Sequence, residues 1–321
     1  MELIIQVVGI VGPICFIVVV GYVYALKRKP DLEAANKINI ELFTPMLIAM
    51  TDRGPDSAGF AIYGDEVADG STKLTLRHPD ENYDWDCLAS AIKDDLGVTV
   101  EWFKNSKVAV FKVGAEVDVV QPYLAENAAD ILILSAGQSI EILKEVGLPK
   151  NIAETFNLAS MKGSHIIGHT RMATESAVTM EGSHPFSTGQ DLCLVHNGSL
   201  SNHNRLREEL KREGVTFQTE NDSEVAAGYL TNRLRKGDTL NEALTNALKD
   251  LDGFFTFTIG TRDGFAVVRD PIACKPAVMA ETDDYVAMAS EYQALTTLPG
   301  IENAKVWEPE PETIYVWERD Q

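Results

Sequence analysis

The sequence predicts an α+β protein that is preceded by a long apolar segment. Short runs of β-branched and aromatic residues recur from about residue 60 to the end of the chain, with amphipathic helical patterns between them. A 24-residue run from Leu3 to Leu26 has one strongly polar side chain, Gln6. Hydrophobic residues make up 45% of the 321 residues, which supports a full-sized core and argues against wholesale disorder.

The apolar run 3–26 predicts a helix. It is long enough to cross about 30 Å of hydrocarbon at about 1.5 Å per residue. The basic residues 27–29 follow at once and place the downstream side in the cytoplasm by the positive-inside tendency. We therefore expect a hydrophobic, membrane-spanning or membrane-embedded helix that anchors a cytoplasmic domain to the inner or plasma membrane. A core helix kinked at Pro13 and a cleaved signal are the alternatives.

The first 45 or so residues also resemble a known family. Residues 7–47 are similar to the opening of auxin-efflux-carrier-type permeases, with a helix ending in Gly-Tyr, a basic turn and an Asp-Leu-Glu helix start. No other run reaches 18 apolar residues, so the further helices of a carrier are absent from the sequence. The resemblance implies a chimera with two parts, residues 1–45 and 46–321.

From residue 46 the pattern is that of one α+β domain. A helix is expected at 240–251, where apolar residues repeat at helical spacing and Gly253 follows. Others are expected at 222–235, which begins with the helix-start signal Asp-Ser-Glu, and at 204–213, which Gly214 closes. Strands are expected at 60–63, 108–113, 131–134, 165–168, 192–195, 254–259, 265–268, 285–289 and 313–317. The acidic tract 80–86 is expected to be a solvated loop.

Charge and cysteine usage exclude some functions. The 28 Lys and Arg residues against 48 Asp and Glu give a formal charge of −20, and no basic stripe is present, so nucleic-acid binding is not expected. The four cysteines lie apart without CxxC pairs, which predicts neither a disulfide framework nor a zinc knuckle and fits a reducing compartment.

Polar residues that could take part in catalysis or binding occur in three clusters, at 52–59, at 168–185 and at 195–224. Five of the six histidines lie between His165 and His203. His165 and His169 would share a helix face and suit a metal ion, but residues 166–168 predict a strand, in which four residues span about 13 Å. We therefore predict no metal site.

The clusters strongly resemble class II glutamine amidotransferases, the Ntn-hydrolase glutaminase domains. Seven motifs occur in that family's order over about 240 residues: RGPDSAG (53–59), HTRMAT (169–174), SHP (183–185), VHNG (195–198), ENDSE (220–224), RDP (269–271) and SEYQAL (290–295). The resemblance implies a four-layer αββα sandwich for residues 46–321. The segment before the first motif and the long stretch that follows it look most like the amidotransferase subunit of glutamate-synthase-like and N-methylglutamate-synthase-like complexes.

The chemistry of these residues agrees with the resemblance. Glutamine hydrolysis needs a nucleophile, oxyanion donors and groups that bind the two charged ends of the amino acid. Arg171 offers a planar fork for the α-carboxylate, and Asp222 offers a counter-charge for the α-ammonium. The Asn197 amide and the Gly198 N–H are candidate oxyanion donors, with Gly198 permitting close backbone approach.

Other interpretations of these residues stay open. Arg171 suits a structural ion pair, Asp222 a helix N-cap, and Asn197 with Gly198 a hairpin turn. The resemblance adds Thr174 and His184 as substrate contacts, and Arg53, Asp56, His169 and His196 as supporting residues. His184 and His196 fit loop-ordering hydrogen bonds better than general bases.

The family's nucleophile has no counterpart in the expected place. In that family an N-terminal cysteine followed by Gly-Ile is the nucleophile, and its own amine, with a pKa of about 8, is the base. This chain opens Met1-Glu2-Leu3, and Val8 occupies the cysteine's place in the echo Val8–Gly12. Cys15 would need the loss of fourteen residues, and Phe16 after it does not match the motif.

The sequence therefore predicts a glutamine amidotransferase domain that binds glutamine but lacks hydrolysis. By resemblance, its ammonia would serve partner synthase subunits that carry flavin and iron–sulfur centres, and the chain itself would need no cofactor. The alternative is a non-catalytic, membrane-tethered glutamine-binding or scaffolding subunit.

Overall fold

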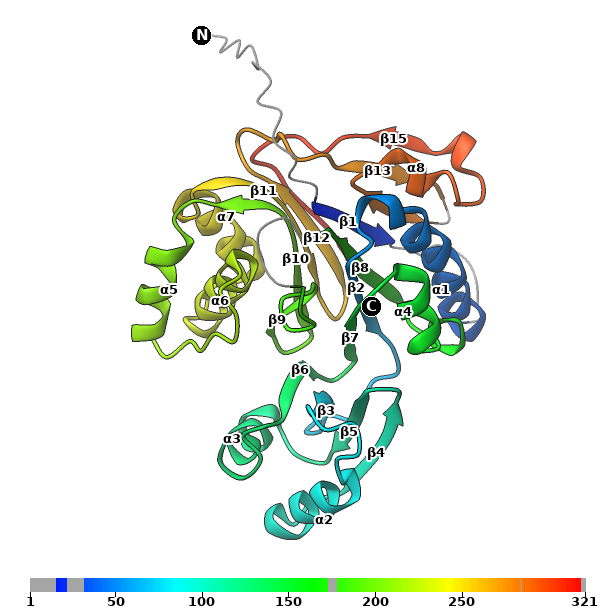
Figure 1. The fold of residues 1–321 in the computed structure, drawn as a ribbon. Helices are drawn as coiled ribbons and strands as arrows, with labels where there is room; N and C mark the ends of the chain where they lie inside the picture. Colours follow the sequence, from blue (N-terminus) through cyan, green and yellow to red (C-terminus); the bar gives the residue numbers. More distant parts are fainter. Residues whose placement is uncertain (1–15, 22–31, 173–177, 284, 319–321) are drawn as a thin grey trace.

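The computed structural model describes residues 16–21, 32–172, 178–283 and 285–318 (Figure 1). Within them the chain forms three β-sheets, of seven, five and four strands, and the paired strands in all three are antiparallel. The seven-stranded sheet has the order β15 (Lys305–Trp307), β13 (Val278–Glu281), β14 (Val286–Ala289), β1 (Phe16–Gly21), β8 (His165–Arg171), β2 (Ser57–Tyr63), β7 (Ile140–Val146).

The other two sheets are smaller. The five-stranded sheet has the order β16 (Ile314–Glu318), β12 (Gly264–Arg269), β11 (Gly253–Gly260), β10 (Leu192–Leu200), β9 (Phe186–Gly189). The four-stranded sheet has the order β4 (Val100–Asn105), β5 (Val108–Val113), β3 (Thr72–Arg77), β6 (Leu132–Gly137).

Helices cover the outer faces of the two larger sheets. The helices are α1 (Leu32–Ala49), α2 (Trp85–Leu96), α3 (Val117–Asn127), α4 (Pro149–Thr155), α5 (His203–Arg212), α6 (Asp222–Arg235), α7 (Leu240–Asp250) and α8 (Tyr292–Leu295). Helices α1, α4 and α8 contact the seven-stranded sheet, α6 and α7 contact the five-stranded sheet, and β1 and β8 contact β10. This stacking of helices on two facing sheets agrees with the α+β sandwich that the resemblance implies, although β1 and most of α1 precede residue 46.

Local sequence explains where several helices begin and end. Thr239 and Glu242 form a capping box at the start of α7. The Asp84 side chain accepts from Cys87 N at the start of α2, and Gly97 ends that helix in the left-handed region. The predicted helix 222–235 coincides with α6, the predicted helix 204–213 is shifted by one residue from α5 at both ends, and the predicted helix 240–251 ends one residue after α7.

The two larger sheets face one another across a shared interior. Along β10, Cys193 faces the seven-stranded sheet, because the Tyr63 hydroxyl of β2 lies 3.5 Å from its sulfur, whereas Leu194 packs in the cluster that contains α5–α7. Along β8, Ile167 reaches toward Gly260 of β11. Since strand side chains alternate, the odd-numbered residues of β8 and β10 point between the sheets. His169, Arg171 and Asn197 therefore share this interior.

The four-stranded sheet is an insertion between β2 and β7 that the sequence did not predict. It occupies the lower part of Figure 1 with α2 and α3, and has a core of its own that includes Trp85, Leu88 and Phe111. Two of its strands, β5 and β6, correspond to the predicted runs 108–113 and 131–134. Nothing in these two runs indicated that they belong to a separate sheet rather than to the sandwich. The periodicity of a strand does not show which sheet it joins.

The helix predicted over residues 3–26 is wrong for residues 16–21. These residues form β1, which pairs with β8 on one side and β14 on the other. A run of valines and isoleucine favours a strand, and a strand in the middle of a buried sheet reads as a continuous apolar run. Residues 3–15 and 22–26 lie outside the described residues.

The predicted division after residue 45 falls inside helix α1, which contacts β1 and β8. The proposed junction with a permease-like start is therefore not supported by a break in the fold. Among the described residues, no helix combines the length and the apolar character that a membrane span requires.

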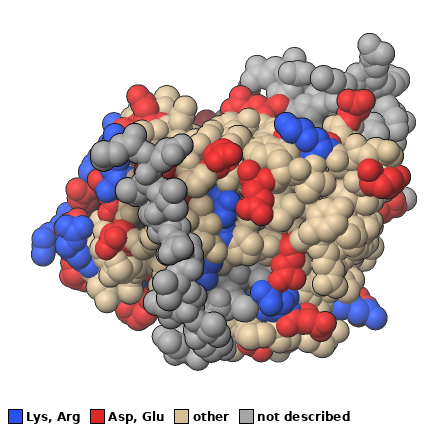
Figure 2. All heavy atoms as spheres, turned by 90° about the horizontal axis from the view of Figure 1, so that it is seen from above, with Lys and Arg blue, Asp and Glu red and all other residues tan. Residues whose placement is uncertain are grey.

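Acidic and basic side chains are interspersed on the face shown in Figure 2. On that face the described residues form no continuous basic surface, in keeping with the formal charge of −20.

Candidate functional site

The turn before β2 is fixed against the end of β8. A Cβ at Gly54 would lie 2.5 Å from the Thr170 carbonyl carbon and 2.6 Å from its Oγ1, so a larger side chain would displace β8. Asp56 N donates to the Arg171 carbonyl at 3.0 Å. The motif at 53–59 thus positions the last residues of β8.

Arg53 joins this turn to the motif at 290–295. Its Nε lies 2.7 Å from Glu291 Oε1, with the arginine side chain 45% exposed. The pair is at the margin of the site, where an exposed ion pair contributes little to stability. This location fits the supporting role expected of Arg53.

Arg171 ends β8 with its side chain buried between the sheets. Burial lowers the pKa of its guanidinium, and the carboxylates of Asp56 and Asp222 oppose that shift. The guanidinium therefore interacts electrostatically with the carboxylate that sequence reasoning paired with it. Gly182 approaches it from the loop before β9, because a Cβ there would lie 3.6 Å from Arg171 Nη1.

Asp222 is the first residue of α6, and its interpretation as the N-cap is wrong. The cap is Asn221, whose side chain accepts from Ser223 N at 2.9 Å. Asp222 Oδ2 instead accepts from Leu200 N at 2.9 Å, and its side chain is 21% exposed. The carboxylate thus joins the start of α6 to the end of β10, two residues after Gly198.

Asn197 and Gly198 lie within β10, where they pair with Thr256 and Phe255, so the hairpin-turn interpretation is wrong. Asn197 is 1% exposed, and neither its Oδ1 nor its Nδ2 has a hydrogen-bond partner among the described residues. Gly198 has φ +152°, and a Cβ there would lie 2.0 Å from the Phe254 carbonyl oxygen. The position therefore demands glycine.

Three buried histidines lie around these groups. The rings of His169 and His184 are 4.3 Å apart between centroids, and none of their nitrogens has a hydrogen-bond partner among the described residues. Burial lowers the pKa of His169 to about 3 and that of His184 well below its ordinary value; the charge of Arg171 adds to both shifts. Both imidazoles are therefore neutral at physiological pH.

His196 belongs to the other face of β10. Its Nδ1 lies 2.9 Å from Ser223 Oγ and 3.9 Å from Asp222 Oδ1. Burial lowers its pKa and Asp222 opposes the shift. The ring orders the contact between β10 and α6.

Two further expectations concern Thr174 and metal ions. Thr174 lies outside the described residues. Groups of three or more side chains that could hold a metal do not occur in residues 16–21, 32–172, 178–283 or 285–318. His165 and His169 lie on strand β8, as expected from the residues between them.

Sequence reasoning missed two residues behind the site. Asp270, in the RDP motif, accepts from Phe255 N at 2.9 Å, directly opposite Gly198. Lys144 of β7 is buried and contacts the loop that carries Gly182. The signal for Lys144 was weak, a single basic residue among the mixed apolar and charged residues 140–146.

Comparisons with known proteins match this region. Residues 169–297 match the family model described as a glutamine amidotransferase domain. The chain is 57% identical to the glutamine amidotransferase-like protein GlxB of Rhizobium meliloti, over 88% of this chain and 93% of that protein. It is 35% identical to an amidophosphoribosyltransferase of Methanocaldococcus jannaschii, over 51% of this chain and 36% of that one. A solved glutamine phosphoribosylpyrophosphate amidotransferase from B. subtilis covers 81% of this chain at 21% identity, with 47% of its own length matched and a TM-score of 0.49.

Proposed function

Since the chain belongs to the glutamine amidotransferase family and is homologous to its class II, Ntn-type members, we propose that it binds glutamine. The binding site lies where β8, β10 and the start of α6 meet. Arg171 binds the α-carboxylate, Asp222 the α-ammonium, and the side-chain amide lies toward Asn197 and Gly198. Thr174 and His184 complete the substrate contacts, with Arg53, Asp56, His169 and His196 in support.

The observation that carries this proposal is that Arg171, on strand β8, and Asp222, on helix α6, come from different elements and interact electrostatically. Each lies at the end of a strand or helix, and the carboxylate acts on the pKa of the guanidinium. A free amino acid offers the complementary pair of charges at one carbon atom. Asn197, buried with its amide unpaired among the described residues, supplies a polar group for the other end of the ligand.

Hydrolysis is a separate matter, because it needs a nucleophile beside the oxyanion donors. Cys193 is buried next to Tyr63, and burial raises the pKa of its thiol to about 11, which disfavours the reactive thiolate. Cys87 lies on α2 in the inserted unit. We propose that the chain binds glutamine without hydrolysing it. Supplying ammonia to synthase subunits that carry flavin and iron–sulfur centres would need a nucleophile, which the sequence does not present in the family's motif.

Calorimetric titration with glutamine tests the binding site. We expect the unmodified chain to bind glutamine and Arg171→Ala to abolish measurable binding, because the carboxylate loses a bidentate, charge-assisted partner. The control is Arg262→Ala, which removes an exposed ion pair with Glu66 and leaves the affinity unchanged. Unchanged affinity in Arg171→Ala would remove Arg171 from its role, and no binding by the unmodified chain would refute the proposal.

Ammonia release tests the second part. The purified chain incubated with glutamine is expected to release no ammonia above the uncatalysed rate. Steady release that Arg171→Ala abolishes would show that a nucleophile is present, and the binding proposal would survive that result.

A further inference from the structure

The loop before β9 is held by side chains from two different elements. Lys144 Nζ, on β7, donates to the carbonyl oxygen of Ser183 at 2.7 Å and to that of Glu181 at 3.2 Å. The carbonyl of Gly182 between them accepts from Asn221 Nδ2 at 3.2 Å. Three consecutive carbonyls are thus fixed by β7 and by the N-cap of α6.

The residue in the middle of this segment lies against the predicted carboxylate-binding group. A Cβ on Gly182 would lie 3.6 Å from Arg171 Nη1. The segment is also tied internally, since Gly182 N donates to Thr179 Oγ1 at 3.1 Å and Ser183 N to Met180 O at 3.0 Å. A movement of these carbonyls would therefore shift Gly182, which lies beside the guanidinium of Arg171.

Lys144 is an unusual residue to find in this place. Its side chain is buried, and the acceptors of its ammonium are main-chain carbonyls, with the Phe186 ring 4.7 Å away. Burying an ammonium is costly, and a structural lysine normally recovers the cost by pairing with a carboxylate. Lys73 does so, with its Nζ 3.1 Å from Glu141 Oε1.

We propose that Lys144 is a positioning residue for the glutamine site: it holds the carbonyls of Glu181 and Ser183 so that Gly182 lies against Arg171 and fixes the guanidinium for the ligand carboxylate. The inference rests on the proposed function of Arg171. It assigns Lys144 no contact with the ligand.

Charge is the property by which Lys144 acts. An ammonium donates stronger hydrogen bonds to carbonyls than a neutral amine does. Burial lowers the pKa of Lys144 to about 8, while Glu224 on α6 and Glu181 on the loop oppose the shift. His184 also faces it, and the ammonium helps to keep that imidazole neutral. Raising the pH through about 8 therefore removes the charge from Lys144 and weakens its hold on the loop.

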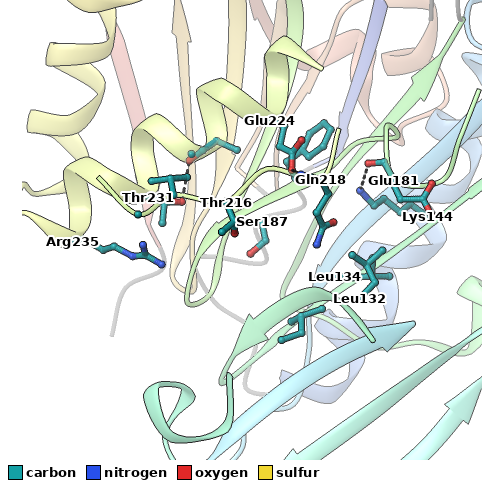
Figure 3. A pocket seen from close by; sticks show the side chains of 16 residues that line it. Leu132, Leu134, Lys144, Glu181, Ser187, Thr216, Gln218, Glu224, Thr231 and Arg235 are labelled. Carbon is teal, nitrogen blue, oxygen red and sulfur yellow. Dashed lines mark hydrogen bonds between the residues drawn. The ribbon is translucent and has the colours of Figure 1, made fainter. Parts of the chain in front are cut away.

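A cavity of about 210 Å³ adjoins the lysine and permits a conservative test (Figure 3). Lys144 and Glu181 lie together at one end of it, near Gln218, and Arg235 lies at the other end. A larger guanidinium in place of the ammonium has room to extend into this space. Lys144→Arg thus keeps a cation at the loop that stays charged at any accessible pH.

The experiment is calorimetric titration with glutamine at about pH 7 and about pH 9 for the unmodified chain, Lys144→Met, Lys144→Arg and the matched control Lys73→Met. At about pH 7 we expect Lys144→Met to bind glutamine about tenfold more weakly, and Lys144→Arg and Lys73→Met to bind within about threefold of the unmodified chain. Free glutamine loses its own ammonium proton in the alkaline range for every variant. The informative quantity is therefore the extra loss of affinity in the unmodified chain relative to Lys144→Arg.

The outcomes separate the two proposals. No binding by the unmodified chain refutes the proposed function and the role of Lys144 with it. Binding that Lys144→Met leaves unchanged, or identical pH dependences for the unmodified chain and Lys144→Arg, refutes the positioning role alone. If Lys144→Met fails to fold by circular dichroism, the comparison with Lys144→Arg across pH still decides.

Discussion

Strand β8 carries two buried histidines on the same face, His165 and His169, which differ in whether their ring nitrogens have hydrogen-bond partners among the described residues. At its start, His165 Nε2 lies 2.8 Å from the Thr261 carbonyl oxygen, its Nδ1 lies 2.9 Å from Ser164 Oγ, and its ring stacks on Tyr63. At its end, both ring nitrogens of His169 have no hydrogen-bond partner among the described residues, although the side chain is equally buried.

The difference distinguishes a structural end of the sandwich from a ligand-binding end. Buried polar groups in native proteins are almost always hydrogen-bonded, and exceptions need an explanation. At the His169 end, His184 and Asn197 share the property. Buried polar atoms that find no partner within the described part of the chain, beside Arg171, are explained if a polar ligand pairs with them.

The largest contrast is expected in stability. His165→Leu should lower the free energy of unfolding by about 3 kcal/mol, because it removes the ring whose Nε2 lies 2.8 Å from the Thr261 carbonyl oxygen and the stacking of that ring on Tyr63. His169→Leu should change it by less than about 1 kcal/mol, since the nitrogens it removes have no hydrogen-bond partner among the described residues. Urea unfolding followed by circular dichroism measures both. Equal destabilisation by the two substitutions would break the comparison.

The next contrast is in acid. His169 has a folded-state pKa of about 3, below its unfolded value of about 6.5, so below pH 6.5 the unfolded state binds a proton that the folded state does not. Stability is therefore lost as the pH falls from 6.5, by about 2 kcal/mol at about pH 5 from this residue.

His169→Leu removes that contribution. Its free energy of unfolding should fall less steeply than that of the unmodified chain between about pH 6.5 and about pH 5. Urea midpoints across this range provide the measurement. Parallel pH dependences would show that folding does not lower the pKa of His169.

The same contrast explains how much the sequence could predict. The motifs at 169–174, 195–198 and 220–224 identified the end of the sandwich where, within the described residues, His169, His184 and Asn197 lack hydrogen-bond partners, because the polar residues of these motifs suit the binding of an amino acid. The helix 222–235 followed from the helix-start signal at 222–224 and the strand 108–113 from its run of β-type residues, and both end as predicted.

Long-range pairing could not be predicted in this way. Residues 16–21 satisfied the pattern of an apolar helix as well as that of a buried strand, and their place between β8 and β14 depends on residues more than a hundred positions away. The inserted sheet was missed for the same reason. The roles of Lys144 and Asp270 were missed because each acts through backbone atoms of another segment: the motif at 269–271 marked Asp270 but not its contact with Phe255 N, and Lys144 lies in no motif.

The smallest expected effect compares two carboxylates that accept from backbone N–H groups. Asp222 accepts from Leu200 N and is partly exposed, whereas Asp270 is fully buried and accepts from Phe255 N and Ile272 N. Asp222→Asn keeps an acceptor for Leu200 N, so stability should change by less than about 1 kcal/mol, but the loss of negative charge should weaken glutamine binding about tenfold.

Asp270→Asn should show the reverse, a lower free energy of unfolding with the affinity of the folded protein within about threefold, because this carboxylate holds the strand opposite Gly198 and faces no ligand charge. Calorimetry with glutamine and urea unfolding of both variants give the two quantities. If Asp222→Asn binds glutamine as tightly as the unmodified chain, Asp222 is a structural link between α6 and β10, and the binding end of the sandwich must take the ammonium elsewhere.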